Sequence, residues 1–271
     1  MSDRHLVTLD ANHPGFRDLQ YRERRDAIAH QALAHRTGDP VPDVVYTEAE
    51  QDVWRDVWEV LHPLHEAHVH PSLQRYQREL GLRNGSIAQF REVNGVLSVT
   101  DFCVEPVAGL VSPADFLHGL ARGVFCATQY MRHASRPLYT PEPDVVHELV
   151  GHIAGLLHPE LAMLNRRFGD AALRSDEPQL MRVLRVYWWT IEFGLVREGE
   201  QVYAVGAGLL SSAGELSGAL KRPELMAWDL EGMAATSFEP SRQNEVLFVA
   251  PGWHVFIAEL TRWLSQLPTT V

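Results

Sequence analysis

The spacing of apolar residues along this 271-residue chain predicts a mainly helical protein. Over residues 177–196, apolar side chains recur every three or four positions, as they do on one face of a helix. The members of that face are Leu180, Val183, Leu184, Tyr187, Trp188 and Ile191. Similar patterns predict further helices over residues 16–38, 51–61, 113–122, 145–157 and 253–264.

The helix over residues 51–61 has a clear start signal. Thr47 and Glu50 form a capping-box pattern, in which each side chain accepts a hydrogen bond from the other residue's backbone N–H. Pro63 and Pro71 predict breaks after this helix, because proline lacks the N–H that a helix interior needs.

Strand patterns are few and scattered. Residues 95–109 predict a strand followed by a turn, and residues 246–250 predict a short strand. Strands and helices do not alternate as they do in a parallel α/β protein. The glycine-rich segment 206–214 lacks the spacing of a dinucleotide-binding loop, which argues against a Rossmann site. We therefore expect one mainly α domain with small β elements.

Composition and charge narrow the class of protein. Of the residues, 45% are apolar, which is enough for a sizeable core, and the formal net charge is −11. Without a block of Lys or Arg, this charge argues against nucleic acid or an anionic membrane as a partner. The sequence shows no apolar run of roughly 18–20 residues and no signal-peptide core near Met1. With only two cysteines and no metal-like Cys spacing, a reduced, cytoplasmic protein is expected.

The segment HELVGHIAGLLH, residues 147–158, combines features of two metal sites. A zinc peptidase needs H-E-x-x-H, with two histidines four apart and a glutamate as the base. Here His147 and His152 are five apart, which is about 140° around a regular helix. Both could reach one ion only if the helix ends or widens between them. A zinc metallohydrolase that uses Glu148 as its base is one alternative, and two ordinary helix histidines are another.

A metal site would need a third ligand. Glu192 follows the apolar and aromatic stretch YWWTI, where a carboxylate is costly to bury unless it is paired or binds a cation. It could instead be exposed at the end of its helix. His158 would share a face with His147 only on an unbroken helix. If Glu192 is buried, two imidazoles and one carboxylate would form the facial triad typical of non-haem Fe(II).

A second group of histidines lies within LHPLHEAHVHP, at positions 62, 65, 68 and 70. It could bind metal. Because the sequence offers it no buried carboxylate and no apolar frame, we interpret it as a solvated helix edge.

Three long segments carry a resemblance to a known family. They are TQYMRHASRPLYTPEPDVVHELVGH at 128–152, YWWTIEFGL at 187–195 and GAGLLSSAGEL at 206–216. In this order they resemble the pterin-dependent aromatic amino acid hydroxylases, and among these the bacterial, single-domain phenylalanine 4-hydroxylases. The match runs from about residue 86 to residue 250. It implies a lead-in and helix over residues 1–40 and a catalytic domain over residues 41–271.

The resemblance also implies an activity. The chain would be a monooxygenase that uses Fe(II), a tetrahydropterin and O2 to convert L-phenylalanine to L-tyrosine. It would take a small aromatic amino acid as its partner, and no nucleic acid or membrane. Eukaryotic members add a regulatory domain and a coiled-coil tail that this chain lacks, so a monomer is expected. The alternatives within the family are a tryptophan hydroxylase and a phenylalanine 3-hydroxylase, and a more remote one is a catalytically silent relative.

Carried over by position, the iron ligands and catalytic residues would be His147, His152 and Glu192. Arg132 would clamp the carboxylate of the amino acid through a bidentate contact. Ser211 would hydrogen-bond His147 beside the substrate backbone. The pterin would be bound through Phe116, through the backbone of Gly109, Leu110, Val111 and Ser112, and near Glu148.

The remaining positions concern the substrate. Thr140 would lie by its backbone and Trp188 against its ring. Members that act on tryptophan tend to have phenylalanine at the position of Trp188, and tyrosine enzymes tend to have aspartate at that of Val249. Phe193 and Gly208 match para-hydroxylating members. Two positions depart from the family pattern, namely Ala154, where relatives usually have proline, and Cys126, near the expected pterin site.

Overall fold

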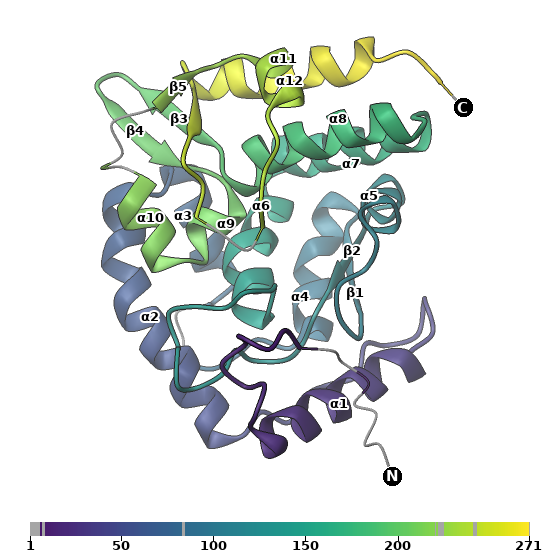
Figure 1. The fold of residues 1–271 in the computed structure, drawn as a ribbon, viewed down its shortest axis with the longest axis vertical. Helices are drawn as coiled ribbons and strands as arrows, with labels where there is room; N and C mark the ends of the chain where they lie inside the picture. Colours follow the sequence, from purple (N-terminus) through teal and green to yellow (C-terminus); the bar gives the residue numbers. More distant parts are fainter. Residues whose placement is uncertain are drawn as a thin grey trace.

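The computed structural model describes residue 6 and residues 9–82, 85–219, 221, 225–240 and 243–270. Residues 1–5 and 7–8 of the predicted lead-in lie outside this described part. As predicted, helices dominate (Figure 1). Their bounds are α1 Leu19–Ala34, α2 Glu48–His68, α3 Pro71–Glu79, α4 Phe90–Leu97, α5 Pro113–Ala121, α6 Ala154–Leu157, α7 Pro159–Leu173, α8 Glu177–Tyr187, α9 Ala207–Leu210, α10 Ala213–Ala219, α11 Leu230–Ala235 and α12 Trp253–Gln266.

Two wider, π-helical segments interrupt the regular helices. One, η2, spans His147–Ile153 and leads into α6, and the other, η3, spans Trp188–Glu192 and continues α8. A short 3₁₀ turn, η1, covers Ser98–Thr100. π-Helical turns are rare and occur frequently at functional sites, so the side chains that these two segments carry are candidates for a site.

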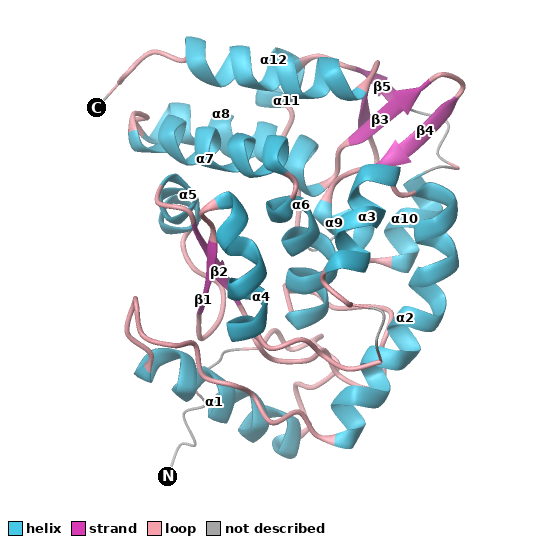
Figure 2. Cartoon of the chain, turned by 180° about the vertical axis from the view of Figure 1, so that it is seen from behind, coloured by secondary structure: helices cyan, strands magenta, loops and turns pink. Residues whose placement is uncertain are grey.

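The strands form two small sheets (Figure 2). In the first, β1 Cys103–Pro106 pairs in parallel with β2 Val124–Ala127. In the second, the order is β4-β3-β6-β5. The bounds in this sheet are β3 Leu195–Glu198, β4 Gln201–Ala204, β5 Leu225–Ala227 and β6 Leu247–Ala250. Among the described strands, only β3 and β4 pair in antiparallel fashion, as a hairpin around Gly199, whose φ of 60° favours glycine.

Helix α2 shows how the local sequence determines an element. Its start is as predicted, because the Thr47 hydroxyl accepts from Glu50 N–H and the Glu50 carboxylate accepts from Thr47 N–H. The predicted break at Pro63 is wrong, since α2 runs through it to His68. The buried positions Trp54, Val57 and Leu61 hold this helix against the core on both sides of the proline. Pro71, in contrast, opens α3 at its first turn.

One strand prediction was also too long. Residues 95–97 belong to α4, and the strand begins only at Cys103. Phe90, Val93 and Leu97 are spaced as on a helix and are all buried, so packing of this face prevails over strand propensity.

The N-terminal helix is attached to the rest of the molecule by polar contacts. Arg24 binds Glu50 of α2 through two nitrogens at 2.8 and 2.9 Å. Arg25 is almost fully buried, forms an ion pair with Glu142 and lies 3.7 Å above the ring of Tyr130. These contacts place α1 beneath the loop that precedes η2 (Figure 1).

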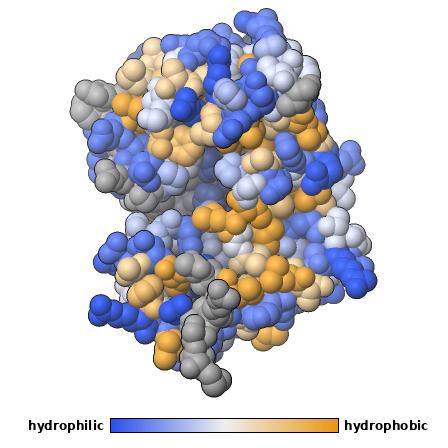
Figure 3. All heavy atoms as spheres, turned by 45° about the vertical axis from the view of Figure 1, so that its right-hand side comes forward, coloured by the Kyte–Doolittle hydropathy of each residue, from blue (hydrophilic) through white to orange (hydrophobic). Residues whose placement is uncertain are grey.

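The core brings the remaining helices together around η2 and η3. Helix α7 packs against α5, α8 and α12, and α9 packs against η2. One face of the molecule is hollowed across its middle, with apolar side chains gathered beside the hollow (Figure 3). Within the described ranges, none of the helices has the length and apolarity needed to cross a bilayer.

Candidate metal centre

The widened helix η2 explains the unusual histidine spacing. In a π-helix the hydrogen bonds run between residues five apart, so side chains at i and i+5 come to lie above one another. His147 and His152 use this spacing, and their Nε2 atoms are 3.0 Å apart. Their ring centroids are separated by 4.8 Å. The two imidazoles therefore converge on one point, which a regular helix would not allow.

Glu192 reaches the same point from the last residue of η3. Its Oε1 lies 3.1 Å from His152 Nε2, and its Oε2 lies 3.8 Å from His147 Nε2. The side chain is only 13% exposed, so the alternative of an exposed glutamate at a helix end is wrong. Two imidazoles and one carboxylate thus meet at a partly buried position that still reaches solvent.

Ser211 sets the protonation of His147. The Ser211 hydroxyl donates to the carbonyl of Ala207 at 2.9 Å, so its oxygen is left to accept from His147 Nδ1–H, also at 2.9 Å. The proton of neutral His147 is thereby placed on Nδ1, and the lone pair of Nε2 faces His152 and Glu192. This is the tautomer that a ligand to a metal through Nε2 requires.

The three groups perturb one another's pKa values. Burial, and next the positive charge of His152, lower the pKa of His147 to about 4. Burial alone would lower the pKa of His152 and raise that of Glu192. Their mutual attraction outweighs burial, so the pKa of His152 is raised and that of Glu192 is lowered. The carboxylate is therefore ionised at neutral pH.

A second carboxylate lies close by. Glu148, His147 and His152 offer ligand atoms within 4.8 Å of one another, so Glu148 competes with Glu192 as a third ligand. Its Oε1, however, already accepts from the backbone N–H of Thr128 at 3.1 Å, and burial raises its pKa to about 7. Glu192 is ionised and points one oxygen at each imidazole, so we favour it over Glu148.

Arg132 is buried and already bound. Its Nε and Nη2 donate to the two oxygens of Asp144 at 2.9 and 2.8 Å, and its Nη1 donates to Pro137 O. Asp144 also accepts from the backbone N–H of His147, so it links the guanidinium to the ligand helix. Burial would raise the pKa of Asp144, but the charge of Arg132 and these hydrogen bonds lower it. One edge of the guanidinium group is thus fixed by Asp144, and Nη1 keeps one N–H beyond its bond to Pro137 O.

Aromatic residues form a wall near Glu192. Trp188 stacks on Phe238 with ring centroids 4.3 Å apart, and it donates from Nε1 to Asn244 at 3.0 Å. Phe193 packs against Trp188 at 4.6 Å. A Cβ on Gly208 would lie 2.5 Å from the Phe193 ring, so only glycine at position 208 leaves room for the ring in this position. The predicted substrate residues Trp188, Phe193 and Gly208 therefore occupy one cluster.

The predicted pterin residues divide into two groups. Phe116 meets Phe125 edge to face at 5.6 Å, and Phe125 lies 4.8 Å from His152, so Phe116 is one ring away from the histidine pair. Gly109, Leu110 and Val111 form the loop before α5, and Ser112 caps that helix by accepting from Asp115 N–H. Leu110 is 74% exposed, which leaves this loop accessible.

The other positions singled out in the sequence are Thr140, Val249 and Ala154. Thr140 donates to the carbonyl of Glu142, in the loop that α1 supports, and its contact with a substrate stays a prediction. Val249 is buried in β6 beside Leu195. Ala154 begins α6 directly after η2, so the helix continues where a proline would disturb it.

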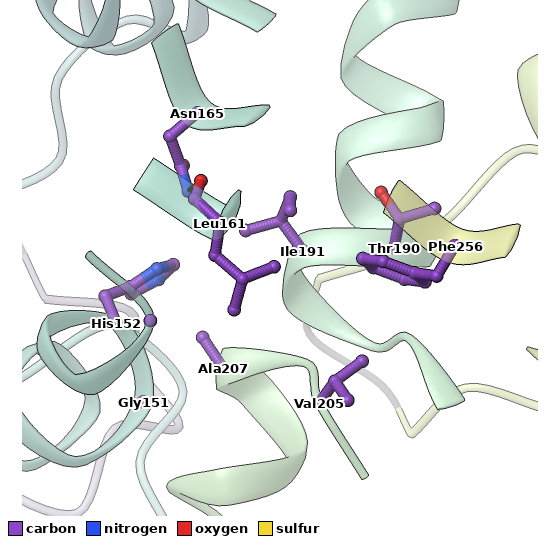
Figure 4. Close-up of a pocket in the computed structure, with 10 residues that line it drawn as sticks. Gly151, His152, Leu161, Asn165, Thr190, Ile191, Val205, Ala207 and Phe256 are labelled. Atoms are coloured by element: carbon purple, nitrogen blue, oxygen red, sulfur yellow. Dashed lines mark hydrogen bonds between the residues drawn. The ribbon is translucent and has the colours of Figure 1, made fainter. Parts of the chain in front are cut away.

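A small cavity adjoins the inner side of the site. It encloses about 20 Å³ and is bordered by His152, Leu161, Asn165, Ile191 and Ala207 among others. Figure 4 shows the His152 ring pointing into the space between Leu161, Ile191 and Ala207. Gly151, beside His152, lies so close to α9 that a Cβ there would be 2.7 Å from Ala207 O. The helix that carries the histidines is thus packed tightly against the helix that precedes Ser211.

Some residues of the site are not among those predicted from the sequence. Asp144 stands just before a predicted helix, and an Asp at that position is a capping signal that could have identified it. Thr128 and Asn244 gave no such signal, because their roles depend on chain segments distant in sequence. The interpretation of His65 as part of a solvated helix edge is wrong, since this residue is fully buried.

Comparisons with known proteins agree with this geometry. The profile of the biopterin-dependent aromatic amino acid hydroxylases matches residues 4–271. The chain is 49% identical over 210 residues, 77% of its length, to a chloroplastic phenylalanine 4-monooxygenase of Chlamydomonas reinhardtii, of which it covers 58%. It is 39% identical over 274 residues, 97% of its length, to a tyrosine 3-monooxygenase of Canis lupus familiaris, of which it covers 55%. It thus spans little more than half of these relatives.

A solved structure has the same fold. Phenylalanine hydroxylase of Chromobacterium violaceum, with bound iron(III) and 7,8-dihydrobiopterin, superposes with a TM-score of 0.75 at 22% identity. The match covers 89% of this chain and 92% of the other.

Proposed function

Because the chain belongs to the biopterin-dependent aromatic amino acid hydroxylase family, we propose that it is a monooxygenase that converts L-phenylalanine to L-tyrosine. It would use Fe(II), a tetrahydropterin and O2. The single observation that carries this proposal is the convergence of His147, His152 and Glu192 from two π-helical segments.

The donor set fits one divalent ion. Ligands that occupy neighbouring positions around an ion, with bonds of about 2.1 Å, lie about 3 Å from each other. The separations here are 3.0 Å between the imidazoles and 3.1 and 3.8 Å from Glu192 to them. Two neutral imidazoles and a carboxylate on one side of an ion are the facial set of non-haem Fe(II). We therefore propose His147, His152 and Glu192 as the iron ligands and the catalytic residues.

The chemistry of oxygen belongs to the bound cofactors. Together they would activate O2, with the pterin supplying two electrons, so that one oxygen atom enters the ring as hydroxyl and the other ends as water. The chain's own residues would keep the ligand geometry and exclude water. Ser211 would hold the tautomer of His147, and the Trp188 wall would fix the ring of the substrate.

The substrate assignment rests on several residues. Arg132 would bind the carboxylate of the amino acid through the edge of its guanidinium group that does not contact Asp144. Thr140 would lie close to the substrate backbone. Trp188, Phe193 and Gly208 would enclose the ring. Val249 is apolar, where an aspartate would favour tyrosine, and the name of the Chlamydomonas relative points the same way. Tryptophan hydroxylation and 3-hydroxylation of phenylalanine are the alternatives.

The pterin would lie on the side of Phe116. The iron(III) and 7,8-dihydrobiopterin in the Chromobacterium structure support this pair of cofactors. Phe116 would stack on the pterin, and the exposed loop of Gly109, Leu110, Val111 and Ser112 would contact it through its backbone. Glu148 would border the same space. A zinc hydrolase with Glu148 as base is less well supported, because Thr128 already holds that carboxylate.

We propose three further properties together with this activity. Residues 41–271 would form the catalytic domain, with residues 1–40 as a lead-in and a helix docked on it. Cys103 and Cys126 are both free thiols, which is consistent with a reducing compartment such as the cytoplasm. The protein would act as a monomer, which light scattering of the purified chain would test.

Product analysis tests the activity directly. The purified chain would be loaded anaerobically with Fe(II) and given tetrahydropterin, O2 and, separately, phenylalanine, tryptophan and tyrosine. We expect pterin-dependent para-tyrosine from phenylalanine, detected by chromatography with mass analysis. Product only from tryptophan, or meta-tyrosine from phenylalanine, would keep the chemistry and overturn the substrate assignment. No product from an iron-loaded protein would overturn the activity.

A further inference from the structure

A buried histidine outside the metal centre contacts the segments that build it. His65 of α2 is fully buried, and its Nε2 lies 2.7 Å from the carbonyl oxygen of Leu210. Its Nδ1 lies 3.1 Å from Oε1 of Gln77, a fully buried residue of α3. The edge of the Trp58 ring packs against the imidazole, with centroids 5.5 Å apart. His65 is therefore held from three sides.

Two of these contacts, those with Leu210 and Gln77, lead to a metal-centre histidine. Leu210 is the last residue of α9, and the next residue, Ser211, accepts from His147 Nδ1. Gln77 continues the path on the other side, because its Nε2 donates to the carbonyl of Val150 at 3.4 Å. Val150 lies in η2 between His147 and His152. His65 and Gln77 thus connect the backbone of η2 with the backbone beside Ser211.

The contact with Leu210 also has a local physical reason. The last carbonyls of a helix have no intrahelical donor, and α9 is only four residues long. A buried carbonyl without a donor is costly, and an N–H of His65 supplies one. An apolar residue at position 65 would fill the space but leave this carbonyl and Oε1 of Gln77 without their contacts to the imidazole.

Displacement of α9 would be transmitted to the ligands. Gly151 approaches Ala207 so closely that η2 and α9 have no room to slide independently. Ser211 Oγ is tied both to Ala207 O and to His147 Nδ1. A shift of Leu210 by a few tenths of an ångström would therefore change the hydrogen bond that orients the His147 ring.

We propose that His65, together with Gln77, is a positioning residue for the metal centre. It fixes the end of α9 so that Ser211 holds the ring and tautomer of His147. This role rests on the proposed function in so far as His147 binds the metal. In this proposal His65 acts through Leu210 and Gln77 and is not itself a ligand of the metal or the substrate.

The test measures metal affinity rather than turnover. Co(II) alone would be the probe, because it accepts the same imidazole and carboxylate ligands as Fe(II) and has a visible spectrum that reports ligand geometry. Its dissociation constant would be measured by chelator competition for the wild type and for His65→Phe, His65→Gln and Gln77→Leu. Gln179→Leu is the matched control. It removes another buried amide, which donates to Pro268 O near the start of α8, at the opposite end of that helix from η3.

We expect His65→Phe to weaken Co(II) binding roughly three- to tenfold and to alter its spectrum. Loss of a residue that hydrogen-bonds directly to a metal ligand lowers metal affinity about tenfold to hundredfold, and His65 is one contact further away. His65→Gln retains an N–H donor and should recover most of the affinity. Gln77→Leu should weaken binding, whereas Gln179→Leu should lower thermal stability alone. If His65→Phe does not fold, the comparison of Gln77→Leu with Gln179→Leu decides.

Different outcomes identify which conclusion fails. Wild-type affinity and spectrum in folded His65→Phe and in Gln77→Leu would overturn the positioning role and leave the metal centre standing. An equal loss of affinity in Gln179→Leu would overturn it too, because general destabilisation would then explain the effect. A wild-type protein that binds no Co(II) would overturn the metal centre and this role together.

Discussion

Glu192 and His152 face each other at 3.1 Å, although they belong to two helical segments 40 residues apart in sequence. The carboxylate also lies near His147, so two imidazoles and an ionised carboxylate meet at one point. We predict that Glu192→Ala abolishes hydroxylation and weakens Fe(II) binding, because the facial set loses its anionic member. Iron content after gel filtration and tyrosine formation would be measured side by side.

The same variant should remain folded. Glu192 is partly exposed, and its removal relieves rather than creates a buried charge. Far-ultraviolet circular dichroism and the melting temperature provide the control. Wild-type turnover in Glu192→Ala would show that the third ligand is another group, with Glu148 the first candidate.

Glu148→Ala should behave differently from Glu192→Ala. The Glu148 carboxylate accepts from Thr128 N–H, so its loss leaves a buried donor unpaired and should cost about 1–3 kcal/mol of stability. We expect measurable hydroxylation with a raised KM for the pterin, since the iron ligands are unchanged. Steady-state kinetics with varied pterin would check this. Complete inactivity of an iron-loaded Glu148→Ala would mean that this carboxylate takes part in the chemistry itself.

The elements that sequence reasoning predicted well are those with local causes. The capping box of Thr47 and Glu50 starts α2 as predicted, and the helix over 253–264 follows from its own apolar spacing. Pro63 failed as a stop signal because packing of the buried face of α2 outweighs the loss of one helical hydrogen bond. Such a balance is decided by residues distant in sequence.

The site was harder to predict in its geometry than in its residues. The five-residue spacing of His147 and His152 left open whether the helix ended or widened, and nothing local to η2 distinguishes the two. The role of His65 depends on its burial, which its neighbours in sequence do not indicate. A histidine flanked by Pro63 and Glu66 looks solvated until α3 and α9 close over it.

Gly208→Ala should distort the aromatic wall. The new methyl group would lie 2.5 Å from the Phe193 ring, which is buried and cannot simply turn away. Overpacking of this kind costs about 1–3 kcal/mol, and we expect a raised KM for phenylalanine and a change in the ring position hydroxylated. Kinetics and product chromatography would measure both. Gly214→Ala is the matched control, since its Cβ would meet only Gln243 at an ordinary 3.6 Å. Unchanged kinetics in Gly208→Ala would remove Phe193 from the substrate wall.

Glu142 should make the attachment of α1 sensitive to acid. It forms an ion pair with Arg25 and lies 3.3 Å from His13. Burial would raise the pKa of Glu142, but hydrogen bonds from His13 and Arg25 lower it below its ordinary value of 4.5. A carboxyl group whose pKa is lowered by folding stabilises the protein above its unfolded pKa, and this stabilisation is lost as the pH falls through the folded pKa. The contribution should therefore be complete at pH 6–7, a range that is roughly two units above that ordinary value.

Glu142→Gln isolates this contribution. At pH 6 the free energy of unfolding of the variant should be about 1.5–3 kcal/mol lower than that of the wild type. This is the range for a hydrogen bond to a charged group. The difference should shrink as the pH falls below that ordinary value and through the lowered pKa of Glu142, where the wild-type carboxyl group also becomes neutral. Urea unfolding of both proteins from pH 7 to pH 3 would measure it, with Glu79→Gln as control, because Glu79 forms only an exposed pair with Arg75. A difference that is independent of pH would mean that Glu142 acts through its shape and not through its charge.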